Sequence, residues 1–329
     1  MKHRVAFRLL VLLLMLTVPM AACAPPAVAT APEPVVEEPA PEESSEAPQG
    51  EAPNLTLELI DGLDREVTLE APATRIVSLA PSNTEILFAI GAGESVVGRE
   101  EFSDYPEEAL TVESIGSVFG DINSEAILAL EPDLVLAAEI NSQEQVEALA
   151  ELGLTVFYLS NPVNFFELYD NLSLVGLMTG HEEEAEALNA ELEARVVAVE
   201  ANVSGREPVS VYYEVDATDV TAPYSAGRDT FQHMLLGLAG GTNVAGNLDG
   251  YPQLSQEELI LLDPEVMIFG ASPWVTTTAE SVAARPGWNA ITAVAEGRVY
   301  GVDSNWVDRP GPRLVDALEA FADILHPDA

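Results

Sequence analysis

The residues of this chain that could carry chemistry are sparse, and their spacing argues against catalysis. The four histidines (His3, His181, His233 and His326) are far apart, and Cys23 is the only cysteine. The sequence has no Gly-x-Ser-x-Gly elbow, glycine-rich phosphate loop or paired-histidine motif. A zinc or manganese site would need several converging nitrogen ligands. The sequence therefore favours a protein that binds a ligand without transforming it, with no catalytic residue, metal site or cofactor of its own.

A duplicated segment indicates how the chain is organised. Residues 125–136 reappear in similar form as residues 257–268, and each copy predicts a helix that begins near a Glu, ends at a Pro and leads into an apolar strand. Upstream, residues 87–98 resemble residues 235–246. The two copies lie too far apart in the sequence for a solenoid, whose repeats span about 20–50 residues. We therefore expect two similar lobes with a cleft between them, because domain interfaces are preferred sites for small ligands.

The rest of the folded body alternates predicted strands and helices, which favours parallel sheets flanked by helices in an α/β fold. Apolar residues recur at helical spacing between His181 and Ala201. This pattern predicts one helix of about 20 residues, roughly 30 Å long, joining the lobes and restricting hinge motion. The expected divisions are an N-terminal lobe over 54–160, a linking helix region over 161–205 and a C-terminal lobe over 206–329.

The beginning of the chain has the features of a targeting segment. Basic residues precede an apolar run too short to span a membrane, and Met20–Cys23 is similar to the lipobox at which bacterial lipoproteins are cleaved. We predict a signal peptide over 1–22, lipidation at Cys23 and a disordered acidic Pro/Ala/Glu tether over 23–53. A simple secretory signal with an incidental cysteine is the alternative. Lipidation would anchor the protein to the outer face of the cell membrane.

The charge balance excludes some partners. The formal net charge is −42, and residues 1–22 hold three basic residues and no acid, so their removal brings the charge to −45. Nucleic acid is excluded because its binding needs a cationic stripe. An anionic membrane surface is disfavoured as a direct partner for the same reason. Solubility is the simplest explanation of the acidity, and attraction of cationic ligands is the alternative.

Five motifs occur in order along the folded part of the chain: Arg75–Glu85, Ser103–Pro106, Leu130–Val135, Ser225–Arg228 and Arg309–Arg313. Together they resemble the substrate-binding lipoproteins of bacterial ABC transporters, in the class that binds cobalamin and iron-siderophores. The resemblance covers about residues 54–329. It implies a monomer with two α/β lobes bridged by one long helix and no enzymatic activity. It also implies delivery of a small ligand to a permease dimer with ATPase subunits.

The resemblance to vitamin B12 binding proteins also implies which side chains line the cleft. Aromatic faces could cover a flat corrin ring, and arginine forks could meet anionic oxygens of a siderophore. Packing within a lobe and surface ion pairs are the alternatives, and Arg313 could simply begin the last helix. A corrinoid is the leading ligand, an iron-siderophore or haem comes second, and a metal-ion carrier or a non-transport lipoprotein has less support. The implied ligand-binding residues are Tyr105, Phe119, Tyr213, Tyr224, Arg228, Tyr251, Trp306 and Arg309.

Two matched acids of the repeat, Glu125 and Glu257, carry a different expectation. The resemblance implies that they are the carboxylates at the lobe tips that dock onto arginines of the permease. Acids in the first turn of a helix also offset the helix dipole, and residues 255–258 fit a capping box closed by Glu258. The repeat alone is consistent with both interpretations.

The predicted anchor can be tested directly. Cys23→Ser is expected to release the protein from membranes in soluble form, because the lipidated thiol is removed, with ligand binding unchanged. Membrane fractionation and the mass of the N-terminal peptide are the measurements. A wild-type protein that is already soluble and has no lipid mass on that peptide would contradict the lipoprotein prediction.

Overall fold

The computed structural model describes residues 56–273 and 275–328. The predicted signal peptide, Cys23 and the tether lie outside the described residues. Within the described residues, no helix is long and apolar enough to cross a membrane.

The N-terminal lobe is built on a four-stranded parallel sheet with strand order β4-β3-β5-β6. A small antiparallel hairpin, β1 and β2, precedes it. Strand β5 is buried along its whole length because helices cover both faces of a parallel sheet. The strands are β1 (Leu57–Ile60), β2 (Glu66–Leu69), β3 (Ile76–Ser78), β4 (Val96–Arg99), β5 (Leu134–Ala138) and β6 (Val156–Leu159), and the helices are α1 (Pro81–Ala89), α2 (Ser124–Ala129), α3 (Gln143–Glu151) and α4 (Phe165–Thr179).

The C-terminal lobe contains a five-stranded sheet in which β9, β7, β10 and β11 are parallel and β8 is antiparallel to β7. Its strands are β7 (Val209–Asp216), β8 (Tyr224–Ser225), β9 (Gly241–Asn243), β10 (Val266–Ala271) and β11 (Val299–Asp303). Its helices are α6 (Phe231–Leu238), α7 (Gln256–Leu262), α8 (Ala279–Ala283), α9 (Thr292–Ala295), α10 (Ser304–Val307) and α11 (Leu314–Leu325).

The two sheets share one topology, which explains the sequence repeat. The order β4-β3-β5-β6 in the first lobe corresponds, element for element, to β9-β7-β10-β11 in the second. The repeated segments fall on α2–β5 and α7–β10. Even the helix ends agree, because Glu131 and Asp263 both have positive φ just before a proline. The predicted α/β fold with two similar lobes and parallel sheets is therefore confirmed.

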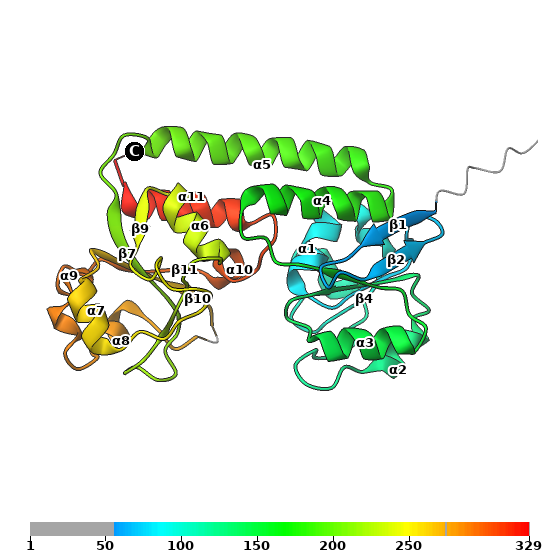
Figure 1. The fold of residues 1–329 in the computed structure, drawn as a ribbon, viewed down its shortest axis with the longest axis horizontal. Helices are drawn as coiled ribbons and strands as arrows, with labels where there is room; N and C mark the ends of the chain where they lie inside the picture. The colour runs from blue at the N-terminus through cyan, green and yellow to red at the C-terminus, as the bar shows by residue number, and fades with distance from the viewer. Residues whose placement is uncertain (1–55, 274, 329) are drawn as a thin grey trace, which may run out of the picture. The chain divides into compact units, whose positions relative to one another are not determined.

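Helix α5 (Glu182–Val203) is the predicted long linking helix and has 22 residues. It runs beside α4 and beside α11 (Figure 1). On the first side, the Asn189 amide donates to the Tyr169 carbonyl at 3.0 Å. On the second, Arg195 donates to Glu319 at 2.9 Å and to Asp316 at 2.5 Å. One helix thus has polar contacts with both lobes.

Candidate functional site

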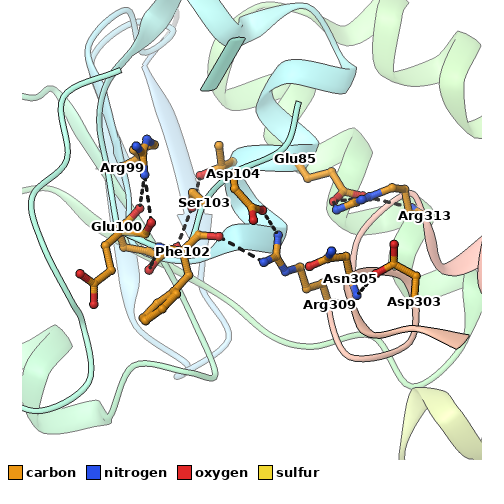
Figure 2. A network of polar contacts seen from close by, with 12 residues as sticks. Glu85, Arg99, Glu100, Phe102, Ser103, Asp104, Asp303, Asn305, Arg309 and Arg313 are labelled. Atoms are coloured by element: carbon orange, nitrogen blue, oxygen red, sulfur yellow. Dashed lines mark hydrogen bonds and ion pairs between the residues drawn. The ribbon is translucent and has the colours of Figure 1, made fainter. Parts of the chain in front are cut away.

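The loop that follows β4 is held in place by a buried polar network. Glu100 accepts hydrogen bonds from the Phe102 main-chain N–H and the Ser103 hydroxyl, both at 2.8 Å. The Arg99 guanidinium donates to the carbonyl of Ala109 at 2.9 Å. Figure 2 shows Arg99, Glu100 and Ser103 close together in this loop. Because ligands of open α/β sheets bind beyond the carboxyl ends of the strands, this loop is a candidate binding element.

The same region of the N-terminal lobe presents aromatic side chains to solvent. Phe119 is 63% exposed and Tyr105 is 44% exposed. Phe102, also exposed, meets Phe119 edge to face with ring centroids 5.8 Å apart. Sequence reasoning missed Phe102, although it lies beside the motif that drew attention to Tyr105. Three exposed aromatic rings near one strand end form an apolar surface that a flat ligand could cover.

Two arginines of the C-terminal lobe reach this loop and α1 (Figure 2). Arg309 Nη1 donates to Asp104 Oδ1 at 2.6 Å, and Nη2 donates to the Phe102 carbonyl at 3.2 Å. Arg313 donates to Glu85 Oε2 from Nε at 2.9 Å and from Nη2 at 2.7 Å. Both cations are therefore already matched by carboxylates of the other lobe.

Tyr213 is not at the surface where the resemblance implied it to be. It has no exposed surface, and its ring packs 6.1 Å from that of Phe321 in the core. Strand β7 is buried on both faces over residues 211–214, so neither side of this stretch opens to a ligand. In this structure Tyr213 is a core residue, and we remove it from the candidate contacts.

The Tyr213 hydroxyl nevertheless binds the carboxyl group of Asp308, the residue before Arg309. It donates to Asp308 Oδ1 at 3.0 Å. Although Asp308 presents surface to solvent, its Oδ2 lies so close to Gly270 that a Cβ there would come within 2.3 Å. This enclosure of the carboxyl oxygens raises the pKa of Asp308 to about 6.

Tyr251 lies near both lobes. Its ring is partly exposed, and its hydroxyl donates to Gln232 Oε1 at 3.4 Å. Burial raises the pKa of Tyr251 to about 12, and the carboxylates of Asp308 and Glu139 add to the shift. Glu139 follows β5 of the N-terminal lobe, so the Tyr251 hydroxyl is close enough to sense a charge on the other side. The role of Tyr251 as a ligand contact stays a prediction.

The other predicted contacts lie in three different settings. Tyr224 is exposed on β8. Arg228 is exposed and pairs with Asp249 of its own lobe, which is the surface ion pair given as the alternative. Trp306 is half-buried in α10 and packs against the core.

The matched acids Glu125 and Glu257 are both exposed in the first turns of α2 and α7. The predicted capping box at α7 is present, and Glu258 closes it as expected by accepting from the Ser255 N–H at 2.8 Å. Within the described part of the chain, neither Glu125 nor Glu257 has a hydrogen-bond or ion-pair partner. Capping of α7 therefore does not use the Glu257 carboxylate. The described residues also contain no cluster of three or more His, Cys, Asp or Glu side chains arranged to hold a metal ion.

Comparison with known proteins shows to which family the chain belongs. The model of the periplasmic binding protein family matches residues 76–306, and the chain belongs to this family. It is 34% identical over 278 residues to the uncharacterized ABC transporter substrate-binding lipoprotein YvrC of Bacillus subtilis, covering 82% of this chain and 85% of YvrC. The protein is accordingly an extracytoplasmic solute-binding component of an ABC importer of the B12, siderophore and haem class, and not an enzyme.

Two further relatives differ in ligand. The chain is 30% identical over 274 residues to a cobalamin-binding protein of Halobacterium salinarum, covering 81% of this chain and 73% of that protein. It is also similar in structure to the periplasmic haem-binding protein RhuT from Roseiflexus sp. RS-1, with a TM-score of 0.68 and 27% identity. That match covers 77% of this chain and all of RhuT, at 100%.

Asp308→Asn is expected to change how stability depends on pH. The folded carboxyl has a pKa of about 6, above its ordinary value of 3.8, so between these values the folded state binds more protons than the unfolded state. Wild-type stability should therefore fall, relative to the variant, as the pH rises through this window. The variant keeps an acceptor for the Tyr213 hydroxyl. Thermal melts from about pH 4 to about pH 8 test this, and a constant difference between the two proteins would contradict it.

Proposed function

We propose that this protein captures a corrinoid between its two lobes and delivers it to the permease of an ABC importer. The observation that carries the proposal is a set of exposed aromatic rings at the carboxyl end of the N-terminal sheet, together with the partly exposed Tyr251 of the other lobe. The nearby arginines are neutralised by acids. The Halobacterium relative, named as a cobalamin-binding protein, supports the same ligand.

The aromatic side chains suit a large flat ring. Tyr105 and Phe119 in one lobe and Tyr224 and Tyr251 in the other are all partly exposed. Aromatic faces cover a corrin macrocycle, and phenol hydroxyls reach the amide groups at its edge. Trp306, half-buried in α10, is the further aromatic contact that we propose. These residues supply surface on both sides of a ligand held between the lobes.

The charges favour an amide-edged ligand over a strongly anionic one. Arg309 and Arg313 are each bound to a carboxylate of the opposite lobe, and Arg228 is bound to Asp249. A ferric siderophore or a haem brings several anionic oxygens, which would have to displace these acids to reach a cation. The similarity to haem-binding RhuT keeps an iron-siderophore or haem as the alternative ligand, with Arg228 and Arg309 as its contacts.

Delivery requires contact with the membrane components. We propose that Glu125 and Glu257 dock onto arginines of a permease dimer, since they occupy equivalent positions in two lobes of the same topology. Both carboxylates are exposed and free of structural hydrogen bonds within the described residues. Lipid on Cys23 would hold the protein, as a monomer, at the outer face of the cell membrane.

Removal of one exposed aromatic ring is expected to weaken corrinoid binding. Phe119→Ala should reduce the affinity for cobalamin about 30-fold, the effect of losing an anchor worth about 2 kcal/mol. Titration calorimetry against cobalamin, cobinamide, haem and a panel of ferric siderophores is the measurement.

Leu152→Ala is the matched control, because Leu152 is an exposed apolar residue after α3, at the opposite end of the N-terminal sheet. It should bind cobalamin like the wild type. Binding of siderophores or haem, without cobalamin or cobinamide, would replace the corrinoid proposal with the alternative.

Charge reversal at either docking residue is expected to stop transport without affecting the ligand. Glu125→Arg or Glu257→Arg should leave ligand affinity intact and abolish uptake, since a repulsive contact replaces an attractive one. Uptake by cells that express the cognate transporter is the measurement.

Glu280→Arg is the control, because Glu280 is an exposed first-turn acid of α8 in the same lobe as Glu257. It should lose only the helix-dipole contribution of about 0.3–1 kcal/mol and transport normally. If the docking variants also transport normally and merely melt at lower temperature, these glutamates are helix-start residues only.

A further inference from the structure

The side chain and the main-chain N–H of Arg313 make four contacts with the N-terminal lobe. Its side chain donates twice to Glu85 Oε2, and its own main-chain N–H donates to Glu85 Oε1 at 3.2 Å. The guanidinium carbon also lies 3.8 Å from the centre of the Tyr105 ring. Arg313 itself belongs to the C-terminal lobe, where it precedes the first turn of α11. One side chain therefore joins α1, the loop after β4 and α11.

The Glu85 carboxylate is buried, and its counter-charge comes from this contact between the lobes. The Glu85 side chain is 2% exposed and that of Arg313 is 12% exposed. Within residues 56–273 and 275–328, Arg313 donates every hydrogen bond that the Glu85 carboxylate accepts. Burial raises the pKa of Glu85, and Arg313 opposes that shift. A carboxylate buried this deeply needs its counter-charge, and the counter-charge comes from the other lobe.

The Glu85 carboxylate lies close against the chain that enters α11. A Cβ on Gly311 would lie 3.2 Å from Glu85 Oε1, which is tighter than an ordinary contact. Nε and Nη2 of Arg313 both donate to the other carboxylate oxygen, Oε2. Two donors of one planar guanidinium that share an acceptor restrain its plane as well as its position.

The Arg313 guanidinium, whose plane is restrained by Glu85, lies over the Tyr105 ring. A guanidinium over an aromatic face is attracted by the ring quadrupole. The residue before Tyr105, Asp104, is bound by Arg309, so two arginines of one lobe hold adjacent residues of the other. The rest of the Tyr105 ring remains open to solvent, at 44% exposure of the residue.

We propose that Arg313 is a positioning residue that holds the Tyr105 ring in the orientation used for ligand contact and couples that orientation to the docking of the two lobes. The inference rests on the proposed function, in which Tyr105 contacts the ligand. Arg313 itself touches no ligand in this scheme. Its action passes from Glu85, through the guanidinium, to the aromatic ring.

The first test needs no ligand. The protein is labelled with 3-fluorotyrosine, and the ¹⁹F signal of Tyr105, one of eight tyrosines, is assigned by its loss in Tyr105→Phe. Arg313→Gln, Arg313→Lys and Glu85→Gln should all move this signal. Arg195→Gln, which breaks an arginine pair with two acids of α11 away from the loop, should not. An unmoved Tyr105 signal in folded Arg313 variants overturns the proposal.

The second test measures coupling in cobalamin binding. Arg313→Gln should weaken binding about tenfold when Tyr105 is present and have little further effect in Tyr105→Ala. A merely structural arginine would lower the affinity equally in both backgrounds, and that result would overturn the proposal. Arg313→Lys keeps the charge beside Glu85 but loses the planar group. Wild-type binding by this lysine variant would also overturn the proposal.

The two tests separate this inference from the function on which it rests. If no variant and no wild-type protein binds cobalamin, the corrinoid proposal fails. A Tyr105 signal that still responds to Glu85 and Arg313 would then show that the positioning contact is correct for another ligand.

Discussion

The two lobes meet at a buried carboxylate whose counter-charge is supplied by the opposite lobe. Glu85 lies in α1, and Arg313 stands at the start of α11, far away in the sequence. Removing the partner of a charge that stays buried costs about 3–5 kcal/mol, so the Glu85–Arg313 pair favours contact between the lobes at this point. Helix α5 provides a second connection through Arg195 and Asn189. The structure therefore holds its lobes together both by a stiff helix and by an ion pair near the candidate site.

This constraint shapes what the site can bind. Asp104, which neutralises Arg309, lies in the loop that also presents the exposed rings of Phe102 and Tyr105, and Glu85, which neutralises Arg313, lies in α1. A ligand that depends on free cations would compete with the contacts that join the lobes. A ligand that uses aromatic surface and amide hydrogen bonds would leave those contacts intact. The chemistry of the site and the joining of the lobes are consequently linked, which is the reason we propose a corrinoid and not a polyanion.

Much of the fold follows from sequence patterns, whereas most of the site does not. The repeat predicted two lobes because helix starts, prolines and apolar strands recur in order, and the matching sheet orders give the reason. The linking helix followed from its apolar spacing. Tyr213 was misplaced because a resemblance between sequences does not reveal that β7 is buried on both faces over residues 211–214. The Glu85–Arg313 pair joins residues 228 positions apart, and no local pattern encodes such a contact. Phe102 was missed because one more apolar residue in a loop carries no distinct signal.

The most direct test of the account is the distance between the lobes. With Cys23 replaced by serine, cysteines introduced by Glu147→Cys and Glu280→Cys would carry one spin label on each lobe. Pulsed electron resonance would then record the distance distribution in the ligand-free protein and in the same protein with Glu85→Gln. The account predicts a single narrow distribution that broadens when the Glu85 charge is removed. An equally broad distribution in both proteins would contradict the claim that this ion pair holds the lobes together.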